Sequence, residues 1–127
     1  MKYGYNKLLK LEFKDAIQKT KEALMSEGFG VLTEIDVKKT MKEKLNIDFE
    51  EYVILGACNP PFAHKALVME EEIGLLLPCN VVIYQKEAGV MVSAILPSSA
   101  MSIVGSNDLN DVAKTVEDKI KKVIDNI

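Results

Sequence analysis

The chain has 127 residues, enough for one domain with a single two-layer core and too few for two such cores. Hydrophobic residues make up 48% and charged residues 28%, which is typical of a soluble globular protein. The formal net charge of -3 provides no broad basic field, so we expect no nucleic-acid partner. No apolar run approaches the roughly 20 residues of a membrane-spanning helix, and the N-terminus lacks an apolar signal core. We therefore expect one cytoplasmic domain over residues 1–127 without a membrane partner.

The first part of the chain predicts alternating strands and helices. Residues 8–11 form a short apolar stretch that indicates a first strand. From residue 13 the apolar side chains recur every three or four positions, which is typical of an amphipathic helix, and Gly28 follows as a left-handed cap. Residues 29–35 predict a second strand. Asp36 then caps a second helix, whose lysines indicate a solvated outer side.

The third strand ends at the most sharply marked corner of the sequence. Residues 52–58 are apolar in succession, which indicates a strand buried on both faces. Asn59 can cap the next helix, and Pro60 and Pro61 suit its first turn because no N–H group is needed there. We expect this helix to end near residue 71.

The last part of the chain predicts a hairpin and a long helix. Residues 81–84 and 90–96 read as two strands, and the turn between them makes them antiparallel neighbours. Pro97 ends the second of these strands and opens a loop. The final helix carries one continuous apolar stripe and begins at Asn107 or Asp108 as cap.

The element order β-α-β-α-β-α-β-β-α predicts an α+β fold. The closing hairpin argues against a fully parallel sheet, so we expect a mainly antiparallel twisted sheet of about five strands with helices packed on it. If the helices cover one face, the other face exposes Val82, Met91 and Ile95 or their neighbours. An uncovered apolar patch of that size is unusual on a monomer. We therefore expect a homodimer.

Two Cys-Asn pairs mark the candidate site. Cys58 precedes a helix N-terminus, where free N–H groups and the helix dipole favour a thiolate, and Cys79 begins the following strand. If these two strands are antiparallel neighbours, the cysteines meet at one end of the sheet. If they are parallel, roughly 17–20 Å separates them. Asn59 and Asn80 follow the two cysteines, so both amides could converge on a small ligand beside the thiols.

Simpler roles compete with each of these assignments. Free cysteine packs as a small apolar side chain, no C-x-x-C motif is present, and asparagines serve as caps and turn formers. Pro60 and His64 are further candidate ligand contacts on the same helix, although helical phase places His64 opposite the buried side. Cys58, Cys79 and His64 supply at most three zinc ligands where a structural site needs four, so we expect no metal.

Three segments carry a family resemblance: residues 28–37, 55–60 and 74–82. Together they resemble the domain-of-unknown-function family 302 (DUF302), over nearly the whole chain and in order. The resemblance implies a small α+β domain similar to the TATA-binding-protein-like fold, associating as a dimer. It implies no reaction and no cofactor.

Three functional hypotheses follow. The first is a homodimeric domain that binds a small molecule or partner beside Cys58, Asn59, Cys79 and Asn80. The second is a thiol-based redox or sulfur-transfer enzyme, with Cys58 as nucleophile and Cys79 as resolving thiol. The third is a structural or interaction module without a site. The sequence decides neither the ligand nor whether the chain is an enzyme.

Overall fold

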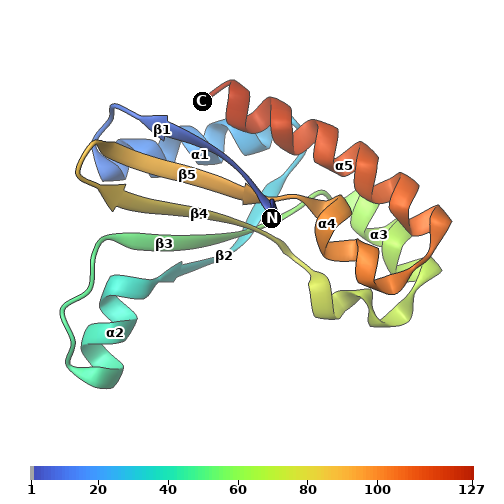
Figure 1. The fold of residues 1–127 in the computed structure, drawn as a ribbon, viewed down its shortest axis with the longest axis horizontal. Coiled ribbons are helices and arrows are strands. Elements are labelled where there is room, and N and C mark those ends of the chain that lie inside the picture. The colour runs from blue at the N-terminus through green and yellow to red at the C-terminus, as the bar shows by residue number, and fades with distance from the viewer. Residues whose placement is uncertain (1) are drawn as a thin grey trace.

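A computed structural model describes residues 2–127 as an α+β fold, as predicted (Figure 1). Five antiparallel strands form one sheet in the order β1-β5-β4-β3-β2. The strands are β1 (Gly4–Leu9), β2 (Gly30–Asp36), β3 (Tyr52–Cys58), β4 (Cys79–Lys86) and β5 (Gly89–Ile95). The α-helices are α1 (Phe13–Ser26), α2 (Val37–Leu45), α3 (Pro60–Met69), α4 (Pro97–Met101) and α5 (Asn107–Asp125). Two 3-10 helices, η1 (Glu71–Leu76) and η2 (Ser102–Val104), complete the fold.

The core lies between one face of the sheet and helices α1 and α5 (Figure 1). Buried and less buried residues alternate along β4 and β5 because successive strand side chains point to opposite faces. On α5 the predicted apolar stripe is the buried face. A fully buried Leu, Ile or Val contributes about 1.5–3 kcal/mol, so this layer supplies most of the driving force for folding. No helix within residues 2–127 has the length and apolarity needed to cross a bilayer.

The opposite face of the sheet carries no helix among the described residues (Figure 1). One cross-strand row on this face runs from Tyr52 through Tyr84 and Met91 to Leu8. The rings of Tyr52 and Tyr84 stack with centroids 5.3 Å apart and an interplanar angle of 13°. The sheet face is therefore uncovered as predicted, and its half-buried apolar residues Val82, Met91 and Ile95 lie among polar ones such as Asn6, Asn80 and Ser93.

Helix α2 stands apart from the core. It projects from the β2–β3 end of the sheet and has no buried residue (Figure 1). Its N-terminus is capped as predicted, since the Asp36 carboxylate accepts the Lys39 N–H at 3.0 Å. Leu45 at its end is exposed, as is Ile47 just beyond. A nine-residue helix is marginal in water without packing, and within residues 2–127 this one packs lightly against β2 and β3.

Gly56 lets two other elements approach strand β3 closely. A bulge in β2 between Val31 and Thr33 interrupts the register, and Thr33 then faces Gly56. A Cβ atom on Gly56 would collide with the Thr33 hydroxyl and would lie 2.8 Å from Cγ of Pro78. The missing side chain is therefore what allows β2 and the start of β4 to pack against this strand.

The structure corrects four predicted boundaries. The first strand, β1, covers Gly4–Leu9 and not residues 8–11. Helix α5 is capped by Ser106, whose hydroxyl accepts the Leu109 N–H at 3.2 Å, and not by Asn107 or Asp108. The segment after Pro97 is helix α4 and not a loop, because proline suits a first helical turn and a distant glutamate binds the next N–H group. Helix α3 ends at Met69 rather than near residue 71, and a 3-10 helix follows.

Candidate functional site

The corner between β3 and α3 positions the first cysteine. Asn59 is the N-cap residue, and its carbonyl oxygen accepts the N–H groups of Phe62 at 3.1 Å and Ala63 at 3.0 Å. Pro60 and Pro61 occupy the first two helical positions and have no N–H group. The helix end therefore offers no free N–H donor. The free N–H groups expected beside Cys58 are therefore not present at this corner.

The Asn59 side chain ties the corner to another part of the chain. This side chain is 8% exposed. It does not cap α3, although the sequence had suggested that it would. Its Nδ2 atom instead donates to the Glu27 carbonyl oxygen at 3.2 Å. Glu27 ends α1, and Gly28 follows with φ +86, which confirms the predicted left-handed cap. The amide of Asn59 is thus engaged in structure.

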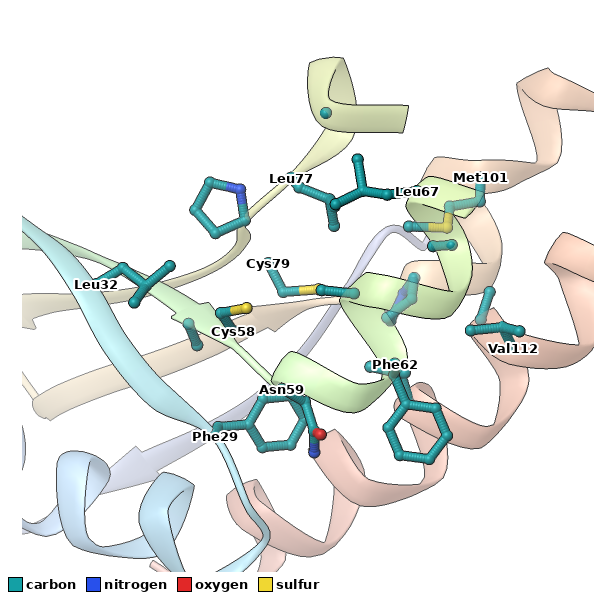
Figure 2. Close-up of a pocket in the computed structure, with 18 residues that line it drawn as sticks. Phe29, Leu32, Cys58, Asn59, Phe62, Leu67, Leu77, Cys79, Met101 and Val112 are labelled. Carbon is teal, nitrogen blue, oxygen red and sulfur yellow. The ribbon is translucent and has the colours of Figure 1, made fainter. Parts of the chain in front are cut away.

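The two cysteines lie on neighbouring antiparallel strands. Ala57 of β3 is opposite Cys79 of β4, so Cys58 is one residue beyond the cross-strand partner of Cys79. Figure 2 shows both sulfur atoms directed toward the same space beside α3. Both thiols are free; Cys58 is half-buried and Cys79 is 9% exposed. Of the two arrangements left open by the sequence, the structure has the one that brings the cysteines together.

Burial raises the pKa of the Cys79 thiol to about 11, with a smaller contribution from the neighbouring Cys58. A buried site disfavours the charged form, because the thiolate loses its hydration and gains no donor in return. Cys79 is therefore a neutral, soft, apolar group at physiological pH. It behaves as part of a wall and not as an activated nucleophile.

Both thiols line one pocket with a volume of about 310 Å³ (Figure 2). Its walls come from the β2, β3 and β4 strands, helices α3, α4 and α5, and the segment before β4. Two exposed leucines also line it, Leu32 at 67% exposure and Leu67 at 42%, so the pocket opens to the surface between apolar side chains. The remaining lining residues are Phe29, Ala57, Asn59, Phe62, Ala63, Ala66, Gly74, Leu77, Pro78, Pro97, Met101, Val112, Ala113 and Val116.

The other predicted site residues lie elsewhere. Asn80 is exposed and opposite Gly56 on the uncovered face of the sheet, whereas Cys79 faces the helices. Asn59 and Asn80 thus do not converge on one ligand. Pro60 and His64 are exposed on α3 and are not among the pocket-lining residues, which agrees with the helical phase of His64. Within residues 2–127 no three His, Cys, Asp or Glu side chains form a metal-binding group.

Most of the pocket was not predicted as a site. The spacing of the lining side chains along α3 and α5 predicts ordinary core packing. It therefore gave no reason to expect a space between the two helices. One signal was present in the sequence: small residues on otherwise apolar faces. Ala63 and Ala66 on α3 and Ala113 on α5 all line the pocket. Small side chains on facing elements leave room that larger ones would fill.

A single antiparallel sheet with an uncovered face and an apolar pocket bearing two thiols defines the class of protein: a small α+β protein with a candidate ligand cavity. The family model described as "Domain of unknown function DUF302" matches residues 5–127, so the chain belongs to this family, as the resemblance indicated. The fold is similar to the crystal structure of the uncharacterized conserved protein DUF302 from Bacillus stearothermophilus. That similarity has a TM-score of 0.93 and 28% sequence identity, over 99% of this chain and 98% of that one. No curated protein matches the sequence.

Proposed function

We propose that this protein binds a small apolar molecule in the pocket beside Cys58 and Cys79, and that it does so as a homodimer. The binding proposal rests on the chemistry of the pocket wall. Apart from two thiols and one amide, every lining side chain is apolar, and the amide of Asn59 is engaged with Glu27. A wall without free polar groups favours ligands that need no hydrogen bonds.

The size of the pocket limits the ligand. An apolar protein cavity of about 150 Å³ stays dry and holds benzene. A pocket of about 310 Å³ therefore has room for a bicyclic ring system or a short alkyl chain. Because the pocket is open between Leu32 and Leu67, a polar end group could remain in water while the apolar part is enclosed.

Titration with the neutral fluorophore N-phenyl-1-naphthylamine tests the proposal, with displacement by linear alcohols of increasing chain length. We expect saturable fluorescence enhancement and stronger displacement by longer chains, up to the length that fills the pocket. Ala63→Phe projects a ring into the pocket from a half-buried position and should abolish binding. Ala88→Phe, in the exposed turn of the β4–β5 hairpin, is the matched control and should bind as the unaltered protein does.

Equal binding by the Ala63→Phe and Ala88→Phe variants would exclude the pocket as the site. Absence of binding by the unaltered, folded protein would favour the third hypothesis, a structural or interaction module without a ligand.

The homodimer is supported by the uncovered sheet face and by helix α2. Leu8 on the sheet face and Leu45 at the end of α2 are exposed, and Figure 1 shows no helix over that face among residues 2–127. A second copy would cover the row from Tyr52 to Leu8 and would add packing to α2, which has no buried residue. The association is isologous in this proposal, since the same face of each copy takes part.

A thiol-based redox or sulfur-transfer enzyme is the second candidate, and the adjacency of Cys58 and Cys79 favours it. The protonated state of Cys79 and the absence of free N–H groups at the α3 end argue against rapid catalysis. Stopped-flow thiol titration distinguishes the two functions. The binding protein should show two slowly reacting thiols, while the enzyme requires one fast thiol at Cys58.

A further inference from the structure

The two cysteines are the only residues in the pocket wall that can form a covalent bond with each other. We propose that Cys58 and Cys79 form a reversible disulfide that weakens ligand binding in the pocket, a form of regulation that rests on the proposed binding function. The pocket would then bind its ligand in the dithiol state and release it on oxidation.

The strand register brings the backbones of the two cysteines close together. Opposed Cα atoms in antiparallel strands are about 5 Å apart and each residue advances by about 3.3 Å. Cys58 is one residue beyond the position opposite Cys79, so the two Cα atoms are roughly 6 Å apart, within the range that disulfides span. Both sulfur atoms already point toward the same space (Figure 2). Successive strand residues point to opposite faces, so regular strand geometry would direct Cys58 away from Cys79, but β3 ends at Cys58 and its side chain lines the same pocket. The bond therefore requires a shift of the chain at the end of β3 and leaves the rest of the strand pairing unchanged.

The two thiols differ in exposure, and this difference sets the order in which an oxidant reaches them. Cys79 is sealed at 9% exposure, whereas Cys58 is half-buried, and both are on the wall of the pocket. An oxidant that enters the pocket therefore reaches Cys58 first. The apolar wall favours an organic hydroperoxide over a strongly hydrated oxidant, because desolvating a polar reagent costs free energy that the wall does not return.

The chemistry is balanced with a hydroperoxide as the two-electron oxidant. The Cys58 thiolate attacks the terminal peroxide oxygen, the O–O bond breaks, and the alcohol leaves with the proton from the Cys58 thiol. The sulfenic acid on Cys58 is then attacked by the Cys79 sulfur, a slow step because burial keeps that thiol protonated. The S–S bond forms, the S–O bond breaks, and water leaves with the Cys79 proton. An external dithiol restores both thiols by exchange.

The bond would join two walls of the pocket. Cys58 leads into α3, which contributes Phe62, Ala63 and Ala66, while Cys79 follows the Leu77–Pro78 wall. Drawing these walls together changes the shape of the space between them. Dispersion contacts weaken steeply when surfaces separate by as little as 0.5–1 Å, so a ligand that fits the dithiol state fits the disulfide state less well.

The test uses the full chain with cumene hydroperoxide as oxidant and N-phenyl-1-naphthylamine as the bound probe. Intact mass should fall by two hydrogens, and peptide mapping should join the peptides that contain Cys58 and Cys79. The dissociation constant of the probe should rise about tenfold, within the usual range for coupled sites, and return on treatment with dithiothreitol. Cys58→Ala and Cys79→Ala should each show the same probe affinity before and after peroxide treatment, once corrected for any change caused by the substitution itself.

The outcomes separate this proposal from the one on which it rests. If the reduced protein does not bind the probe, the proposed binding function fails and the regulation fails with it. If the reduced protein binds and the disulfide forms without changing the affinity, only the regulation is overturned. Oxidation of Cys58 to the sulfinic acid without linkage to Cys79 would also overturn it. If peroxide still weakened probe binding by the Cys79→Ala variant, the proposed regulation would likewise be overturned.

Discussion

Asn59 donates a hydrogen bond of 3.2 Å from its side-chain nitrogen to the carbonyl oxygen of Glu27, across 32 residues of chain. This bond joins the end of α1 to the start of α3. Gly28 adjoins the same amide, since a Cβ atom there would lie 3.2 Å from Nδ2 of Asn59. Phe29, the next residue, lines the pocket. The bond therefore fixes the two segments that form one side of the pocket.

Removing this bond should destabilise the fold. Asn59→Ala leaves the Glu27 carbonyl without its partner, and an unsatisfied part-buried group costs about 1–3 kcal/mol. Urea unfolding followed by circular dichroism measures the change. The matched control is Asn80→Ala, an exposed asparagine that also follows a cysteine, which should change the free energy of unfolding by less than about 0.5 kcal/mol. A larger loss for Asn80→Ala than for Asn59→Ala would contradict this assignment.

Glu117 should act on the pocket through helix α4. Its buried carboxylate accepts the Ser98 N–H at 3.0 Å and the Ser98 hydroxyl at 2.5 Å, which holds α4 against α5. Pro97 and Met101 on α4 line the pocket. Glu117→Ala should lower the free energy of unfolding by about 2 kcal/mol and weaken probe binding, because hydrogen bonds to a charged acceptor are strong.

Two further variants separate this role from a general loss of stability. Glu117→Gln keeps one acceptor and should restore part of the probe affinity. Asp118→Ala changes the exposed acidic neighbour and should leave both the stability and the affinity unaltered. If Glu117→Ala is destabilised with unchanged affinity, α4 does not shape the pocket.

The Cys79 thiol should make stability depend on alkaline pH. Its pKa is raised to about 11 in the folded protein from an ordinary value near 9. Between these pH values the unfolded chain has lost the proton and the folded chain has kept it, so stability falls as pH rises. The contribution is fully present below about pH 9 and is lost by about pH 11, for a total on the order of 2 kcal/mol.

Unfolding curves for the unaltered protein and for Cys79→Ala, measured at several pH values from neutral to about 11, provide the check. The difference between their free energies of unfolding should shrink as the pH rises. Two curves that stay parallel across this range would show that Cys79 titrates normally and is more exposed than its position indicates.

The homodimer should depend on the uncovered sheet face. Met91→Glu places a charge in the cross-strand row beside Tyr84 and should shift the protein from dimer to monomer in analytical ultracentrifugation. Val68→Glu, at an exposed position on α3, is the control and should remain dimeric. A monomeric unaltered protein at micromolar concentration would refute the homodimer. A dimer that persists in the Met91→Glu variant would place the interface elsewhere.

The sequence was sufficient to predict the architecture because its signals are local. Alternation in β4 and β5, the helical stripe of α5, and the glycine and proline boundaries each reflect neighbouring residues. The cap of α5 was misplaced by one residue because Ser106, Asn107 and Asp108 are all good caps, and only the backbone conformation selects among them.

The candidate site was predicted only in part, since it depends on contacts between distant segments. Adjacency of Cys58 and Cys79 required the pairing of β3 with β4, which the sequence left open. The face of Asn80 could have been anticipated, because the residue after an inward strand position points outward. The pocket exists because side chains of α3, α4 and α5 leave a space between them unfilled. The side-chain spacing along a single helix does not predict such a space.

The pocket lining runs from Phe29 to Val116, so the pocket draws on early and late parts of the chain alike. A chain in which α5 has not yet packed has no such cavity, whatever its earlier strands have done. Occupancy would therefore require α5 to be packed in place, and a bound molecule would stabilise the folded state with the logarithm of its concentration.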